Sequence, residues 1–158
     1  MRFMGDSFDD GASPDWFVYE DPSTLMLYDE DGRLVQPSAA HWEALVGLPG
    51  SLLVPTSRDQ DSEPFPVRVP GRTFRDLIVA VHQFYTSPVG TGEYVPDDCD
   101  YCVDAAARMR AGETVLRFEL LGSRGVVPMD EGQRRHPFAC TGLVRFEGVY
   151  RDALALGS

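Results

Sequence analysis

The strongest structural signal in the sequence is an amphipathic helix over residues 73–85. Its apolar residues recur with the spacing of one helical face: Phe74, Leu77, Ile78, Val81, Phe84 and Tyr85. At the start, Thr73 followed three residues later by Asp76 resembles a capping box, and Pro88 ends the helix soon after Tyr85. We therefore expect this segment to be the one long helix of the fold.

Two shorter helices are predicted on either side of it. Ser38 is a good N-cap for a helix over residues 38–46, with Trp42 and Leu45 on its buried side and Glu43 on its exposed side. Residues 100–111 are rich in Ala and are followed by Gly112, a typical C-terminal stop.

Short strands account for most of the remaining apolar segments. We expect strands at residues 16–19, 25–28, 33–35, 52–54, 67–69 and 153–156, with a tight hairpin turn at Asp31 and Gly32 and an exposed loop over residues 56–66. The predicted fold class is α+β: an antiparallel sheet of short strands packed with one long and two shorter helices.

Two further segments, residues 116–120 and 144–147, repeat an alternation of apolar and charged residues. This is the period of a sheet with one buried and one wet face. We expect the two segments to pair antiparallel, with Phe118 opposite Phe146 on the buried face. The same register would pair the charged residues of the wet face, Arg117 with Glu147 and Glu119 with Arg145.

A length of 158 residues suits a single domain, and 43% hydrophobic residues argue against disorder throughout. The net charge of −11 is concentrated at the N-terminal end, where residues 1–31 carry nine acids against Arg2 alone. We expect residues 1–15 to be a flexible acidic arm and residues 16–158 to be one α+β domain.

Residues 72–158 resemble a family of uncharacterised proteins found in fungi and in large DNA viruses of amoebae. The resemblance is carried by the helix from Arg75 to Pro88, and by residues 118–124 followed by Phe146, Glu147 and Gly148. The long loop between the closing strands departs from the family pattern. The resemblance implies an α+β fold and a viral origin, and it implies no activity.

The sequence contains none of the common catalytic motifs. A Ser/His/acid triad would draw on His41, His82 or His136, and no G-x-S-x-G elbow is present. No glycine-rich phosphate loop is found, so no nucleotide cofactor is expected. A hydrolase without a recognisable motif stays open as an alternative.

Three cysteines and one histidine have the spacing of a metal site. Cys99 and Cys102 form a C-x-x-C pair, and His136 with Cys140 supplies a second pair of ligands, which together would hold a structural zinc ion. Ordinary unligated thiols are the alternative. A redox pair is disfavoured because the neighbouring acids oppose a thiolate.

These features favour a protein that binds another protein or has a structural role, such as a virion or host-contact factor, over an enzyme. An acidic decoy that imitates nucleic acid is a second alternative, whereas direct nucleic-acid binding is disfavoured by the charge. With no apolar run of membrane-spanning length, no signal peptide and an odd number of cysteines, we expect an intracellular, reducing location, the host cytoplasm or the virion. Oligomeric state is left open.

Overall fold

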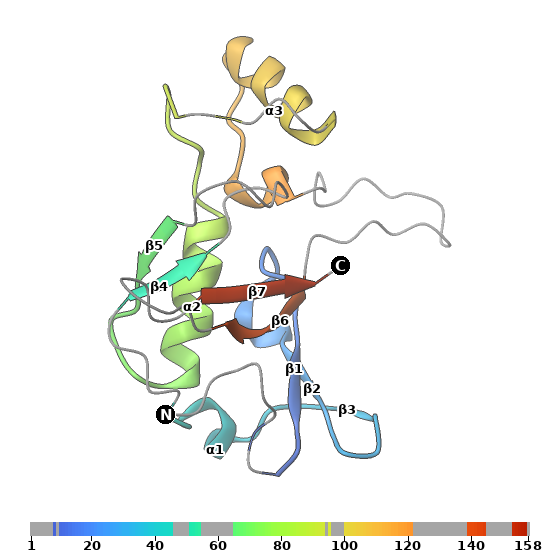
Figure 1. Cartoon of the computed structure of the whole chain (residues 1–158). Coiled ribbons are helices and arrows are strands. Elements are labelled where there is room, and N and C mark those ends of the chain that lie inside the picture. The colour runs from blue at the N-terminus through green and yellow to red at the C-terminus, as the bar shows by residue number, and fades with distance from the viewer. Residues whose placement is uncertain are drawn as a thin grey trace.

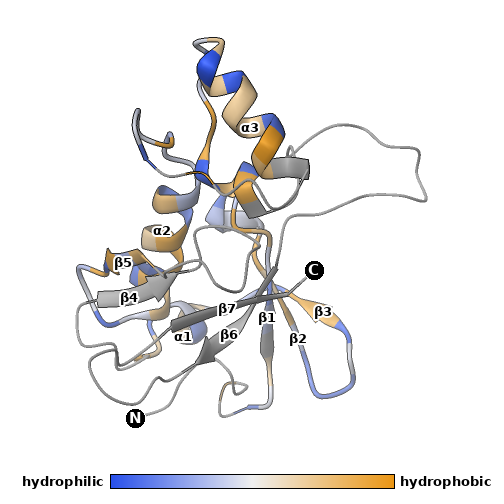
Figure 2. Cartoon of the chain, turned by 45° about the horizontal axis from the view of Figure 1, so that its top comes forward, coloured by the Kyte–Doolittle hydropathy of each residue, from blue (hydrophilic) through white to orange (hydrophobic). Residues whose placement is uncertain are grey.

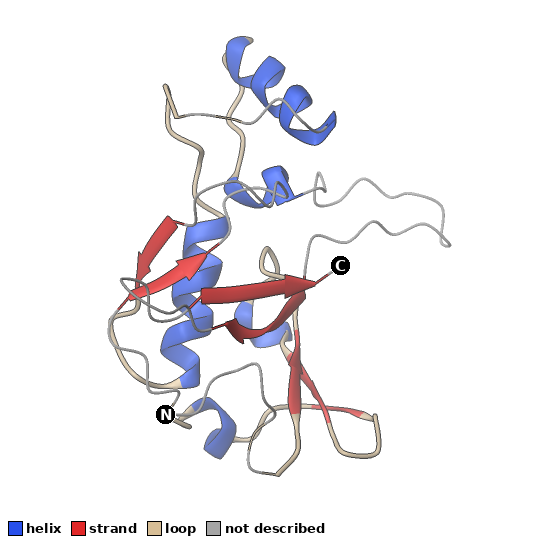
Figure 3. Ribbon diagram, in the orientation of Figure 1, coloured by secondary structure: helices blue, strands red, loops and turns tan. Residues whose placement is uncertain are grey.

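The computed structural model describes residues 8, 10–45, 51–54, 65–93, 95, 100–121, 139–144 and 153–157. It confirms the α+β class, with a three-stranded sheet, a four-stranded sheet and three α-helices (Figures 1 and 3). The main core lies between α2 (Phe74–Tyr85) and residues of the N-terminal sheet and its connections.

The N-terminal sheet is antiparallel in the order β1-β2-β3, with β1 (Ser13–Asp15), β2 (Met26–Tyr28) and β3 (Leu34–Val35). The predicted hairpin is confirmed: the Gly32 N–H donates to the Asp29 carbonyl over 3.0 Å, and Gly32 has a φ of 75°. That positive φ explains why the turn uses glycine.

The second sheet has the order β5-β4-β7-β6, with β4 (Ser51–Val54), β5 (Phe65–Arg68), β6 (Ala139–Val144) and β7 (Ala153–Gly157). Neighbouring strands are antiparallel except β4 and β7, which are parallel where Leu53 meets Ala153. The strands predicted at residues 52–54 and 153–156 are confirmed. Within the described sheet, β5 is an edge strand.

The long helix is where the sequence predicts it. Thr73 and Asp76 form a reciprocal capping box: the Asp76 N–H donates to Thr73 Oγ1, and the Thr73 N–H donates to Asp76 Oδ2. The predicted apolar face is buried apart from Phe84, which is half-buried against the core. Hydrogen bonds from Thr73 hold the pKa of the Asp76 carboxyl below its ordinary value.

Helix α1 (Ala39–Trp42) begins at the predicted cap, Ser38, but it is a single turn and does not reach residue 46. The chain leaves the helix because Leu45 forms a β-bridge with Thr73, and the Phe74 N–H donates to the Ala44 carbonyl over 2.9 Å. The expected burial of Leu45 is therefore wrong, since Leu45 is 74% exposed.

The strand expected at residues 16–19 lies three residues earlier, at β1. Trp16 and Val18 are buried in the main core, while the Glu20 N–H donates to the Phe17 carbonyl and closes a turn. Ala12 is also buried, so the ordered domain begins before Trp16, and part of the segment expected to be a flexible arm is in a strand. Residues 1–7 and 9 lie outside the described residues.

Helix α3 (Asp100–Arg110) is confirmed, and Gly112 follows it with a φ of 84°. It lies at one end of the molecule, beyond the C-terminal end of α2 (Figure 1). A small second core joins α3 to the segments on either side of it through Val89, Ala105, Val115 and Leu120.

The strand predicted at residues 116–120 is wrong, because Arg117–Leu121 forms a 3-10 helix, η2. Glu119 causes the turn: its Oε2 accepts the Leu116 N–H over 2.7 Å, and its Oε1 accepts from Arg108 over 2.7 Å. A helical segment cannot form the expected strand pair with residues 144–147, of which only Val144, at the end of the described part of β6, is described, and there it pairs with Ala153 of β7. Phe118 is nevertheless buried, as predicted, whereas Phe146 lies outside the described residues.

Candidate functional site

A groove of about 460 Å³ runs between edge strand β5 and helix α2, and we call it the α2–β5 groove. Its walls are mainly apolar and include Phe65, Pro66, Pro70, Val79 and Phe84. Phe65 and Val79 are 44% and 37% exposed, which places two large apolar side chains in one hollow of the surface. Figure 2 shows hydrophobic residues on β5 beside α2.

The end of the groove is built from stacked rings. Phe65 and Phe84 stack with their centroids 5.3 Å apart and an interplanar angle of 24°. The Arg117 guanidinium lies 4.8 Å from the Phe84 ring centroid and 5.5 Å from that of Phe65. Cation–π contacts of this kind hold both rings in place, so η2 supports the aromatic end of the groove.

Arg117 is itself held by Glu93. Its two terminal nitrogens donate to the two Glu93 carboxylate oxygens over 3.0 and 2.7 Å, in bidentate geometry. Those hydrogen bonds are the main reason why the pKa of the Glu93 carboxyl is below its ordinary value. The aromatic end of the groove is thus preorganised by charged groups that neutralise each other.

Arg68 is the only charged side chain among the described residues that line the groove. It is exposed, and it has no ion-pair partner within the described part of the chain. As far as the described residues go, the groove therefore offers an apolar floor beside a guanidinium that has no acidic partner.

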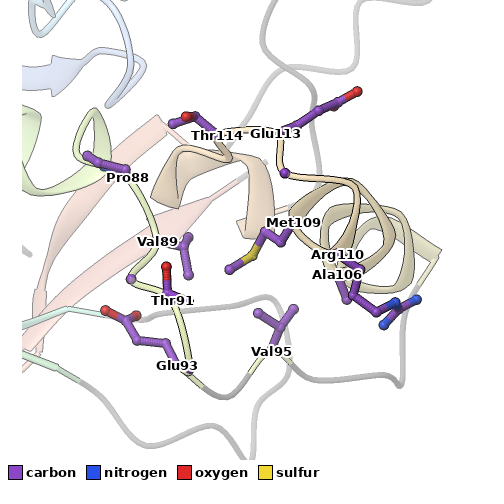
Figure 4. A pocket seen from close by; sticks show the side chains of 13 residues that line it. Pro88, Val89, Thr91, Glu93, Val95, Ala106, Met109, Arg110, Glu113 and Thr114 are labelled. Atoms are coloured by element: carbon purple, nitrogen blue, oxygen red, sulfur yellow. The ribbon is translucent and has the colours of Figure 1, made fainter.

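A larger hollow of about 820 Å³ lies between α3 and residues 88–93 and 95, and we call it the α3 hollow (Figure 4). Val89, Val95 and Met109 form its apolar part, and Arg110 points away from Val89. Its two acids are engaged elsewhere, Glu93 with Arg117 and Glu113 with Arg108. A catalytic pocket brings several free polar side chains together at one point, and the described residues of the α3 hollow form no such group.

The structure brings together one set that resembles a catalytic triad, from Ser38, His41 and Asp10. Ser38 Oγ lies 2.9 Å from His41 Nδ1, and His41 Nε2 lies 2.7 Å from Asp10 Oδ2. However, His41 Nδ1 already accepts the Ser38 N–H over 3.0 Å, as part of the α1 capping box. The lone pair that a general base would need is thus occupied, and none of the three residues lines either hollow.

The physical effect of this set is to hold the N-terminal segment on the domain. Phe8 packs edge-on against the rings of His41 and Phe74, with centroids 4.9 and 5.2 Å apart. Asp10 also accepts the Ala12 N–H over 3.1 Å. No local sequence pattern predicts this contact, because Asp10 and His41 are 31 residues apart.

We expect Asp10→Asn to destabilise the protein at neutral pH and to have no such effect in acid. The pKa of Asp10 is lowered from 3.8, first by the hydrogen bond from Ala12 and then by that from His41. A lowered carboxyl pKa stabilises the folded state above the unfolded value, and this contribution disappears as the pH falls through the folded value. Urea denaturation at pH 6, 4, 3 and 2, followed by tryptophan fluorescence, measures the difference.

The matched control is Asp15→Asn on β1, since the Asp15 carboxylate forms no hydrogen bond within the described part of the chain. The two variants should differ at pH 6 and converge below pH 3. An Asp10→Asn effect that is equal at every pH would show that charge is not its cause.

The predicted zinc ligands are only partly described. Cys102 lies on α3 and is fully buried, with its Sγ 3.9 Å from the Leu120 carbonyl oxygen, and Cys140 lies on β6 opposite Leu156. Cys99 and His136 lie outside the described residues. Among the residues that are described, no three His, Cys, Asp or Glu side chains form a group able to hold a metal ion. The zinc site stays a prediction.

The sequence interpretation missed the groove, although one signal for it was present. Val79 is an apolar residue outside the apolar stripe of the long helix, on the face that an amphipathic helix turns to water. The sequence predicts an exposed loop at Phe65, because the stacking of Phe65 on Phe84 depends on β5 pairing with β4, which no local pattern shows.

None of the helices in the described parts of the chain is long and apolar enough to span a membrane. In comparisons with known proteins, no family model matches the chain, and neither a curated protein nor a solved structure matches it significantly. The α2–β5 groove is therefore the feature of the described structure that points to a function.

Proposed function

We propose that this protein acts by binding another protein through the α2–β5 groove, without catalysis. The observation that carries the proposal is the exposed, preorganised aromatic end of the groove, where Phe65 stacks on Phe84 under Arg117. Exposed apolar surface in a concave, rigid site is typical of interaction sites, and aromatic residues and Arg are enriched there.

The alternatives have less support. For the acidic decoy, two of the described acids are engaged locally: Asp10 with His41 and Ala12, and Asp29 with the N–H groups of Asp31 and Arg33 in the hairpin turn. For the hydrolase, the set of Ser38, His41 and Asp10 has no free base, because Nδ1 of His41 already accepts the Ser38 N–H. The narrower role of virion or host-contact protein is supported only by the resemblance of residues 72–158.

The test compares two valines on helix surfaces. Val79 lines the groove on α2, and Val103, which is 48% exposed, lies on α3 and lines neither hollow. We expect Val79→Asp to abolish capture of a partner from extracts of the native cell, identified by mass spectrometry, and Val103→Asp to leave it unchanged. Thermal unfolding of both variants verifies that each is folded.

Loss of capture by both variants, or by neither, would contradict the proposal. Sedimentation velocity of the purified protein distinguishes a second copy of this chain from a foreign partner. If Val79→Asp converts a dimer to a monomer, the groove is a homodimer interface and the proposal of a foreign partner is wrong.

A further inference from the structure

We propose that the partner segment bound in the α2–β5 groove is an extended peptide with a single carboxylate beside an aromatic or large aliphatic side chain, and that this carboxylate pairs with Arg68. This inference rests on the proposed function and specifies the chemistry of the partner. The shape of the groove, the backbone of β5 and the charge of Arg68 each define one property of this peptide.

The shape favours a linear segment. The groove lies between one strand and one helix, so its two walls run side by side (Figure 1), and its volume of about 460 Å³ is that of a site for a few side chains. The floor is apolar, and Phe65 and Val79 remain exposed on it. An aromatic or large aliphatic side chain would bury these surfaces, which is the main source of affinity in such a site.

The backbone of β5 argues against recognition by strand addition. β5 is four residues long and contains Pro66, which has no N–H to donate. Proline on an edge strand weakens any added ladder and is one of the ways in which proteins protect such edges. Recognition must therefore depend mainly on side chains that enter the groove.

The positive charge of Arg68 determines which polar group the bound peptide carries. Arg68 has no ion-pair partner among the described residues, and none of the described lining residues is acidic. A carboxylate accepts two parallel hydrogen bonds from a guanidinium, and beside apolar surface this pair is stronger than in open water. A carboxylate is therefore the complementary group.

The charge of the whole chain limits how many carboxylates are favourable. At −11 the protein repels a strongly acidic partner at long range. That repulsion is screened beyond about 8 Å at physiological salt, whereas contact with Arg68 is direct. A peptide with one carboxylate and otherwise neutral or basic residues avoids the long-range repulsion and still pairs with Arg68.

The experiment uses a phage-displayed library of random 12-residue peptides, selected on the full chain. We expect the enriched peptides to share Asp or Glu within three positions of Phe, Tyr, Trp, Leu or Met. The strongest is synthesised, and its affinity is measured by fluorescence anisotropy. We expect Arg68→Glu to weaken binding at least tenfold, and replacement of the peptide's acid by Lys to restore binding to that variant.

Arg72→Glu is the matched control, because Arg72 is exposed, is close to Arg68 in the sequence and does not line the groove. Arg72→Glu changes the net charge by the same amount as Arg68→Glu. An equal loss of peptide affinity in both variants would therefore contradict pairing of the carboxylate with Arg68. Binding that is lost with Val79→Asp but kept with Arg68→Glu would refute the carboxylate inference and leave the proposed function standing. If no selected peptide depends on Val79, the proposed function itself fails for linear partners.

Discussion

Replacement of Phe74 by alanine should lower the free energy of unfolding by about 3 to 5 kcal/mol. Phe74 is fully buried at the start of α2, where it stacks on Trp42 at a centroid distance of 5.4 Å and meets the edge of Phe8. One ring thus joins the N-terminal segment, α1 and α2. Its removal would leave a cavity between three elements that cannot close without moving one of them.

Urea denaturation of Phe74→Ala measures this effect, with Val79→Ala as the control on the exposed face of the same helix. The control should change stability by no more than about 1 kcal/mol, since an exposed substitution on a helix loses little packing. A Phe74→Ala effect as small as that of the control would show that Phe8 and Trp42 do not pack on this ring in solution.

Phe118→Ala is expected to have a similar effect, about 3 to 5 kcal/mol, for a different reason. Phe118 comes from η2, late in the chain, but its ring belongs to the main core and lies 5.3 Å from the ring of Tyr19. The substitution would therefore detach η2 from the N-terminal half of the domain. Since η2 also carries Arg117, we expect the support of the groove to weaken as well.

A double-mutant cycle tests whether Tyr19 is the partner of Phe118. Phe118→Ala and Tyr19→Leu, alone and combined, should show a coupling of about 0.5 to 1.5 kcal/mol, as aromatic pairs do beyond their buried area. The control combines Phe118→Ala with Leu34→Ala, which removes an exposed side chain on β3 that has no described contact with η2. Strictly additive effects would rule out the Tyr19 contact.

Features specified by neighbouring residues could be predicted from the sequence. The long helix, its Thr73 and Asp76 cap, the hairpin turn at Gly32 and the end of α3 at Gly112 all agree with the structure. In each case the deciding interaction joins residues at most four positions apart, or depends on the φ that glycine alone adopts easily. Such signals are present in the sequence before any tertiary contact forms.

The errors arose where a distant contact overrides a local pattern. Residues 116–120 alternate like a strand, but the ion pair of Glu119 with Arg108 accompanies the 3-10 helix η2 instead. Leu45 lies in a predicted helix, but in the structure it forms a β-bridge with Thr73. The intrinsic helix and strand propensities of residues span only about 1 kcal/mol, so one ion pair or β-bridge can decide which structure a segment forms.

The α2–β5 groove depends on tertiary structure in the same way. Phe65, Phe84, Arg117 and Glu93 belong to four separate segments, and no local spacing relates them. The sequence by itself determined the two longer helices, α2 and α3, the glycines that turn the chain and where the net charge lies. Only the tertiary structure decided which side chains share a surface, because long-range packing brings together residues whose separation in the chain carries no periodic signal.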